Sequence, residues 1–176
     1  YNVAVSGMTG SGTVIASLAA GVAHDAAGNA NAASTSTDAS VTYDVTLPAV
    51  TINQATAQAD PANATPVNFS VEFSEPVSDF ATGDVTLSGT AGATTATVTG
   101  SGTSYNVAVS GMTGSGTVIA SLSAGVAHDA AGNASAASTS TDASVTYDVT
   151  VPAVTINQTT AQADPTNGTP INFRVE

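Results

Sequence analysis

Apolar and polar residues alternate with a period of two along much of the chain, and this alternation predicts short β-strands. It is clearest over residues 66–73, where Val67, Phe69, Val71 and Phe73 fall on one face and polar side chains fall on the other. The same rule predicts six further strands, at 49–53, 84–88, 93–99, 104–109, 117–122 and 143–148. Glycine-rich segments at 99–102 and 111–116 predict turns between strands, the first of them a hairpin.

Seven short strands within about 100 residues predict an all-β protein with the immunoglobulin-like β-sandwich as its fold. The chain has no cysteine and no tryptophan, so the disulfide and the buried Trp of antibody domains are absent. We therefore expect a sandwich of the broader immunoglobulin-like class. Tyr43 and Tyr147 are expected to serve as core or corner residues of this sandwich and not as ligand-binding surfaces.

The chain also repeats itself with an offset of 104 residues, because residues 1–72 match residues 105–176 with only eight substitutions. A period of this length is that of an independently folding domain, so the sequence predicts a tandem array of domains. We assign residues 1–44 to the C-terminal part of one repeat, 45–148 to one complete repeat and 149–176 to the N-terminal part of the next. The joints at 41–48 and 145–152 contain a proline and no glycine, which predicts a semi-rigid rod.

Neither flanking part can bury a sheet face alone, since a sandwich needs two sheets. We therefore expect each part to pack against strands from neighbouring repeats of the same polypeptide or from neighbouring copies in a filament. A second possibility is that residues 149–176 of one copy complete residues 1–44 of another. That composite would lack the counterpart of residues 73–104.

The charge of the chain is strongly one-sided, with thirteen carboxylates against one basic residue, Arg174. Residues 45–148 carry eight carboxylates and neither lysine nor arginine. This balance excludes nucleic acid and anionic membrane surfaces as partners, because both require basic patches. No apolar segment approaches the length of a membrane span, so no membrane insertion is expected. The carboxylates either keep neighbouring domains soluble and apart, or they hold cations.

The sequence predicts no enzymatic activity. Each repeat has a single histidine, His24 or His128, and the Gly-x-Ser-x-Gly elbow of serine hydrolases is missing. Glu72 and Glu75 lie three residues apart at the end of a predicted strand, which does not produce the paired carboxylates of a glycosidase.

One motif has two interpretations, and it occurs as residues 24–29 and again as residues 128–133. Its Asp and Asn oxygens, on a loop that contains a glycine, are suitable ligands for a hard cation such as calcium. The same residues also fit an Asx-type turn, in which the side chains cap the backbone and the glycine takes a positive φ.

Several segments together resemble the bacterial Ig-like repeats of giant surface adhesins, a group that includes biofilm-associated and RTX-type adhesins. They are 71–77 (Val-Glu-Phe-Ser-Glu-Pro-Val), Phe80, 83–85 (Gly-Asp-Val), 129–133 (Asp-Ala-Ala-Gly-Asn) and 145–148 (Val-Thr-Tyr-Asp). The resemblance covers the whole period. It implies an extracellular, cell-surface extender in which calcium is often held near the domain joints. The linker 148–152 departs from the Asp-Thr-Thr-Ala-Pro-like joint of such repeats, and the RTX nonapeptide is absent.

We therefore expect a structural extender of a cell-surface adhesin or an extracellular filament, with calcium as its cofactor. The alternative is a binding module whose loops hold a carbohydrate or another surface protein. The candidate calcium ligands are the aspartates of the expected joints and loops together with two loop asparagines: Asp25, Asn29, Asp44, Asp60, Asp129, Asn133, Asp148 and Asp164.

Overall fold

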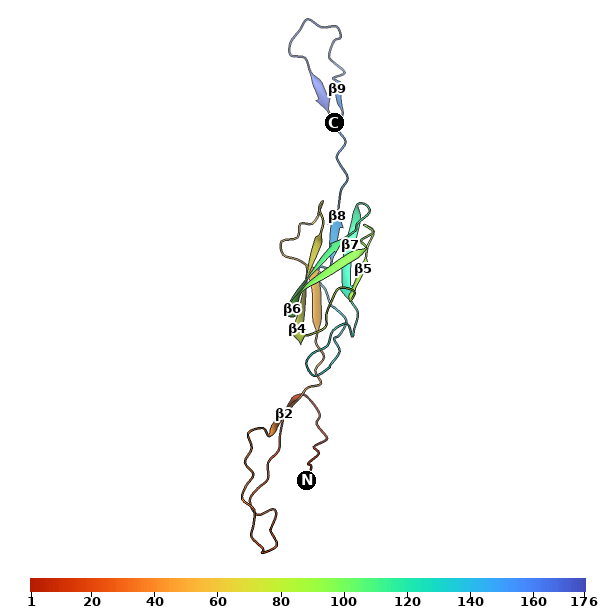
Figure 1. Cartoon of the computed structure of the whole chain (residues 1–176). Helices are drawn as coiled ribbons and strands as arrows, with labels where there is room; N and C mark the ends of the chain where they lie inside the picture. Colours follow the sequence, from red (N-terminus) through yellow and green to blue (C-terminus); the bar gives the residue numbers. More distant parts are fainter.

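A two-sheet sandwich occupies the middle of the molecule in the computed structural model, which describes residues 1–176 (Figure 1). The first sheet has the order β3-β4-β6 and consists of β3 (Val50–Gln54), β4 (Val67–Val77) and β6 (Thr95–Ser110). The second has the order β5-β7-β8 and consists of β5 (Val85–Ser88), β7 (Gly116–Leu122) and β8 (Ser144–Tyr147). All paired neighbours run antiparallel.

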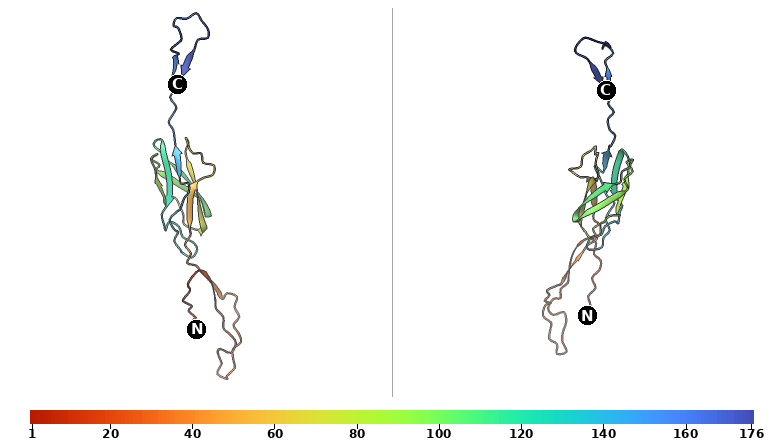
Figure 2. Two further views of the ribbon diagram at one scale, coloured as in Figure 1. Left: turned by 180° about the vertical axis from the view of Figure 1, so that it is seen from behind. Right: turned by 45° about the horizontal axis from the view of Figure 1, so that its top comes forward.

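Two small hairpin-like flanks extend from opposite ends of the sandwich (Figures 1 and 2). The N-terminal flank, residues 1–44, contains β1 (Gly12–Ile15) paired with β2 (Ser40–Tyr43). The C-terminal flank, residues 149–176, contains β9 (Ile156–Gln158) paired with β10 (Phe173–Val175). The molecule contains no helix long and apolar enough to cross a membrane.

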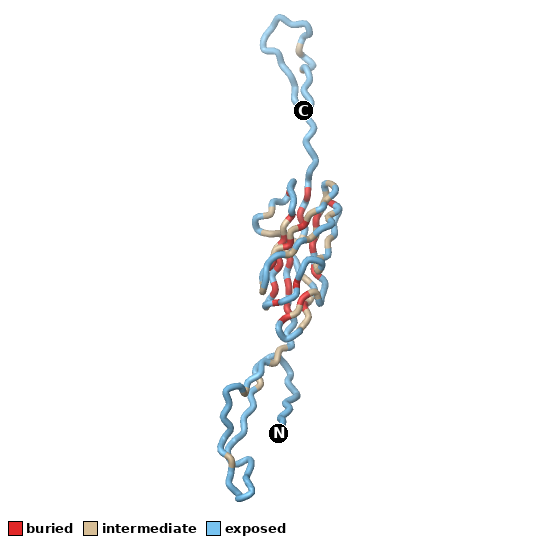
Figure 3. The backbone as a smooth tube through the Cα atoms, viewed as in Figure 1, coloured by how far each residue is buried: buried red, intermediate tan, exposed pale blue.

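The core lies between the two sheets and is built from the inward residues of alternating strands. Nineteen buried apolar residues form one cluster, and nearly all buried positions lie in the sandwich (Figure 3). In β4, Val67, Phe69, Val71 and Phe73 are buried as the alternation predicts. Four residues that were also predicted to face inward, Val85, Leu87, Ala96 and Val98, are only partly buried. They lie on β5 and on the first part of β6, before its turn at Gly100.

The predicted strands at 93–99 and 104–109 form one uninterrupted extended segment, β6. A straight strand of 16 residues would be about 50 Å long, yet the backbone N–H of Thr94 donates to the carbonyl of Ser110 at 3.1 Å. The segment therefore folds back on itself, and the predicted hairpin is confirmed. Gly100 and Gly102 have positive φ, and a Cβ on Gly100 would lie 2.5 Å from the Ser104 carbonyl oxygen. Only glycine fits such a close approach.

Strand β4 continues past the predicted end at residue 73 and includes Pro76. Its pairing with β6 is irregular between Glu72 and Val77, and such an irregularity tolerates a proline that cannot donate a ladder hydrogen bond. Beyond it, Phe73, Phe80 and Tyr105 pack edge to face, and the Tyr105 hydroxyl donates to the Val77 carbonyl at 3.1 Å. This extension places Glu75 at the end of the sandwich that faces the N-terminal flank.

Replacing Phe69 by alanine should destabilise the sandwich by about 3–5 kcal/mol, because the ring is fully buried and a cavity would remain. Its repeat counterpart, Phe173, is 61% exposed in the C-terminal flank and provides a matched control. Phe173→Ala should leave the unfolding of the sandwich nearly unchanged at low protein concentration. Denaturant titrations followed by circular dichroism measure both, and equal effects of the two substitutions would contradict the assignment of the core.

Candidate metal centre

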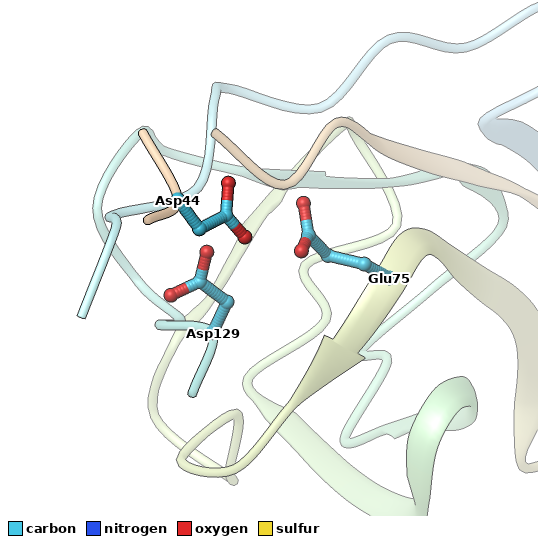
Figure 4. Close-up of side chains that lie close together, drawn as sticks. All are labelled: Asp44, Glu75 and Asp129. Atoms are coloured by element: carbon cyan, nitrogen blue, oxygen red, sulfur yellow. The ribbon is translucent and has the colours of Figure 1, made fainter. Parts of the chain in front are cut away.

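Three carboxylates, those of Asp44, Glu75 and Asp129, meet where the N-terminal flank joins the sandwich (Figure 4). One oxygen of each lies within 4.8 Å of the others. They line an open cleft of about 350 Å³ together with Thr42, Pro76, Ala130 and Ala131. In the repeat assignment, Asp44 ends one repeat, whereas Glu75 and Asp129 belong to the next. We call these three residues the junction cluster.

Asp44 follows β2 directly and is held by a small hydrogen-bond network. Its Oδ1 accepts hydrogen bonds from the Ser11 hydroxyl at 2.8 Å and from the backbone N–H of Thr46 at 2.9 Å. The Ser11 oxygen also accepts from the N–H of Val45 at 3.0 Å. These donors lower the pKa of Asp44, the backbone N–H of Thr46 most of all. Asp44 is therefore a fixed anion at the start of the linker.

The same network recurs at the second joint. Asp148 Oδ1 accepts from the Ser115 hydroxyl at 3.1 Å and from the N–H of Thr150 at 2.9 Å, and the N–H of Val149 donates to Ser115 at 3.0 Å. We call the two networks, Ser11–Asp44–Thr46 and Ser115–Asp148–Thr150, the linker clasps. Each one orients the first residues of the linker, as the expected semi-rigid joint requires.

Glu75 reaches the cluster because of the alternation of β4. It has the same parity as the buried residues Phe73 and Val77, so its side chain lies on the inward side of the strand at the open end of the sandwich. Partial burial raises the pKa of Glu75, and the neighbouring charges of Asp44 and Asp129 raise it further. Glu75 is therefore the one carboxylate of the cluster whose pKa is raised, and its charged form is the least favourable of the three.

Asp129 belongs to the loop between β7 and β8 and is 7% exposed. Its Oδ1 accepts from the N–H groups of Ala131 and Asn133, both at 2.8 Å, and its Oδ2 accepts from the Asn133 side-chain amide at 2.8 Å. Gly132 has a φ of 88°. The Asx-type turn is therefore confirmed, and its donors, Asn133 first, lower the pKa of Asp129.

Asn133 is not a member of the junction cluster, but its side chain connects the two repeats through hydrogen bonds. Its Nδ2 donates both to Asp129 and, at 3.2 Å, to the backbone carbonyl of Asp44. In the N-terminal flank, Asn29 donates to Asp25 at 2.8 Å in the same local arrangement. In both loops the asparagine thus donates a hydrogen bond to the aspartate and holds its carboxylate in place.

The remaining predicted ligands lie apart from the junction cluster. Asp25 and Asn29 form an exposed turn in the N-terminal flank. Asp60 accepts a hydrogen bond from the N–H of Thr146 at 2.9 Å. Asp148 belongs to the second linker clasp, and Asp164 is exposed in the C-terminal flank. Of the eight predicted residues, two therefore belong to the junction cluster, Asp44 and Asp129, and Asn133 contacts both of them as a hydrogen-bond donor.

Glu75 is the member of the cluster that the sequence prediction left out. The signal was present, because Glu75 continues the inward series of odd-numbered residues in β4 where an apolar residue is expected. A carboxylate at an inward position at a strand end is unusual and marks a site that meets another polar group.

No basic side chain compensates the cluster. The two ion pairs of the structure join His128 to Asp79 at 2.7 Å and Arg174 to Glu176 at 2.5 Å, and neither includes a member of the cluster. Three carboxylates that converge without a basic partner are chemically suited to bind a hard divalent cation through oxygen.

The two antiparallel sheets, packed face to face around a single core without a disulfide, define an immunoglobulin-like β-sandwich. A sequence model of the bacterial Ig-like domain family matches residues 44–149, which is more than half of the chain. The chain belongs to the bacterial Ig-like domain family, so the predicted fold class and the predicted resemblance to bacterial Ig-like repeats are confirmed. Domains of this family are typically non-catalytic and commonly extracellular. No curated protein and no solved structure matches the chain.

In metal-free buffer at neutral pH, Glu75→Gln should raise the thermal unfolding midpoint, because it removes one of three converging negative charges. Glu72→Gln is the matched control, since Glu72 lies in the same strand, is exposed and accepts a hydrogen bond from Ser104 at 2.6 Å. The control should not raise the midpoint. Differential scanning calorimetry of the three proteins measures the difference, and a lower midpoint for Glu75→Gln would contradict the repulsion.

The pH dependence of stability should have a maximum on the acidic side of neutrality. The raised folded-state pKa of Glu75 makes its charge unfavourable at neutral pH, and protonation relieves this as the pH falls through that pKa. The folded-state pKa values of Asp44 and Asp129 are lowered, so their contribution is present above the unfolded-state pKa and is lost as the pH falls through the folded-state one. Stability should first rise and then fall on acidification, and Glu75→Gln should lack the rise. A purely falling wild-type profile would overturn this.

Proposed function

We propose that this chain is part of a structural extender in which immunoglobulin-like repeats are joined end to end and calcium stiffens the joints. The observation that carries the proposal is the junction cluster, because its three carboxylates come from two successive repeats. A cation bound there would connect the end of one repeat to the body of the next. The extracellular cell surface, in an adhesin or a filament, is the setting that this role requires.

The geometry of the cluster fits calcium. Calcium binds six to eight oxygens at about 2.3–2.6 Å, so two ligand oxygens on opposite sides of one ion lie about 5 Å apart. The three carboxylate oxygens lie within 4.8 Å of one another and can therefore share one ion. Asp44, Glu75 and Asp129 would hold it, and water in the open cleft would complete the coordination. Calcium supplies the positive charge that the residues around the cleft lack.

The linker clasps support the same function without a cation. Each fixes the aspartate and the first linker residues through short hydrogen bonds, and each occurs at the same place in its repeat. A joint with a defined starting direction and no glycine transmits the orientation of one repeat to the next. This behaviour is typical of a rod and differs from that of domains on a flexible tether.

The use of aromatic residues favours the extender over a binding module. Five of the eight aromatic side chains, Phe69, Phe73, Phe80, Tyr105 and Tyr147, are buried in the sandwich core. The other three, Tyr1, Tyr43 and Phe173, lie in the flanks. The sandwich therefore exposes no aromatic surface of the kind on which sugars or partner proteins commonly bind.

Calcium should bind the metal-free protein and raise the free energy of unfolding of the sandwich, by about 2.7 kcal/mol when free calcium is 100 times Kd. Asp44→Asn should abolish or strongly weaken this binding. Asp148→Asn is the matched control, because Asp148 is the repeat counterpart of Asp44 but has no cluster around it in this chain. Isothermal titration calorimetry measures the affinities, and equal binding by wild type and Asp44→Asn would exclude this site.

The stiffening itself can be measured because the chain has no native cysteine. Spin labels at Thr37→Cys and Thr86→Cys, both exposed, report the distance between the N-terminal flank and β5. Calcium should narrow this distance distribution in the otherwise native chain and leave it broad in Asp44→Asn. If calcium binds but the distance distribution does not narrow, the ion does not stiffen the joint.

A further inference from the structure

The sandwich is closed along one of its long sides, where the edge strands β3 and β8 of the two sheets lie side by side. The N–H of Ile52 in β3 donates to the carbonyl of Thr139, in the segment before β8, at 3.1 Å. In the same way, the N–H of Ala62, in the segment after β3, donates to the carbonyl of Thr146 in β8 at 2.8 Å. Backbone hydrogen bonds between the two sheets therefore cover both of these edges.

The opposite long side is open. Strand β5 is the outer strand of its sheet, and the first arm of β6, residues 95–99, is outermost in the other sheet because β4 pairs only with residues 102–109. An open cleft of about 490 Å³ is lined by residues of both edges, among them Val85, Leu87 and Ala96. We call β5, the first arm of β6 and this cleft the open seam.

The open seam carries no charge, although the chain has a net charge of −12. Residues 85–127 contain no aspartate, glutamate, lysine or arginine, and every residue that lines the cleft is uncharged. The nearest carboxylate in the sequence, that of Asp84, accepts a hydrogen bond from the N–H of Ala81 at 2.8 Å. Two copies of this acidic chain therefore repel each other least where their open seams meet.

The first arm of β6 also lacks the usual protection of an edge strand. Exposed edges are commonly blocked by charged side chains, by proline or by a covering loop. The arm contains neither a charge nor a proline, and one side chain covers it, since the Thr82 hydroxyl accepts a hydrogen bond from the N–H of Val98 at 3.0 Å. Most of this edge is thus available to a further strand.

The sequence of the arm is complementary to itself. It reads Thr95-Ala96-Thr97-Val98-Thr99, with the three threonines exposed and the two apolar residues half-buried. If two such arms pair antiparallel about a two-fold axis at Thr97, Thr95 lies opposite Thr99 and Ala96 lies opposite Val98. Threonine then meets threonine on the outer face and apolar residues meet on the inner face, and both kinds of cross-strand pair are stabilising.

We propose that two copies of the chain associate side by side through their open seams, with the first arms of β6 paired antiparallel. The sheets that contain β6 then continue from one molecule into the other, and the Ala96 carbonyl of the second copy replaces the Thr82 hydroxyl as the acceptor for Val98. The contact does not include the junction cluster and is independent of the proposed cation. An antiparallel contact suits rods that project from facing surfaces, a consequence that rests on the proposed extender function.

Sedimentation velocity in the presence of a chelator should show an average mass that increases from 16.9 kDa toward that of a dimer as the protein concentration rises. A two-fold contact uses the same surface on both copies and therefore closes at the dimer. Added salt should favour the dimer, because it screens the repulsion between the two acidic copies. A monomer at every concentration, with and without salt, would overturn the proposal.

Thr97→Asp should lower the association constant by roughly ten- to a hundredfold, because it places two like charges opposite each other on the two-fold axis. Thr51→Asp is the matched control, since Thr51 is also an exposed threonine but lies in β3, on the closed side of the sandwich. It should have little effect on association. Circular dichroism checks that both variants keep the fold, and equal association constants for the two variants would contradict the proposed interface.

The register can be tested by oxidation of single cysteine variants, because the chain has no native cysteine. Thr97→Cys should form a disulfide-linked dimer. Thr95→Cys and Thr99→Cys should each stay monomeric alone but form a mixed dimer with each other, since these positions lie opposite one another in the antiparallel pair. Efficient dimer formation by Thr95→Cys alone, or none by Thr97→Cys, would overturn the antiparallel arrangement.

Discussion

The structure depends on one constraint, which is that an apolar sheet face is stable only when a second sheet covers it. The repeat shows this within a single chain. Phe69 and Phe173 occupy the same place in nearly identical sequences, yet Phe69 is fully buried and Phe173 is mostly exposed. Because the local sequences are nearly the same, the difference arises from the strands that surround Phe69, namely β6 beside it and the facing sheet over it. The stability of the fold therefore comes from contacts between residues far apart in the sequence, as is usual for β-sandwiches.

This constraint also determines where the charges lie. Most inward positions of the strands are occupied by apolar residues, so most carboxylates are left to the outer faces, the loops and the two ends of the sandwich. The ends are also where successive repeats meet, and three of the carboxylates converge at the joint between the N-terminal flank and the sandwich. Glu75 is the exception, because it lies between the buried residues Phe73 and Val77 of β4 and is only partly buried itself. Its raised pKa is the physical consequence of this position.

The sequence predicts those features that follow from local pattern. The parity of Val67 to Phe73, the hairpin at Gly100 and the Asx-type turn at Asp129 all depend on neighbouring residues, and all are present. The junction cluster does not depend on local pattern. Asp44, Glu75 and Asp129 lie far apart in the sequence, and their convergence depends on how the linker directs one repeat toward the next. Periodicity contains no information on that direction, so Glu75 was not predicted as a partner of Asp44.

Some structural features form within one repeat alone, whereas others require the neighbouring repeat. The turn at Asp25 has the same hydrogen bonds as the turn at Asp129, although no second sheet lies over the N-terminal flank. The linker clasps at Asp44 and Asp148 are also alike, although only Asp44 has Glu75 and Asp129 beside it. Turns and clasps are therefore local, whereas the core requires one complete repeat and the carboxylate cluster requires two adjacent ones. It follows that a joint has a preferred starting direction before any cation binds, and that a cation would act on a linker already partly ordered.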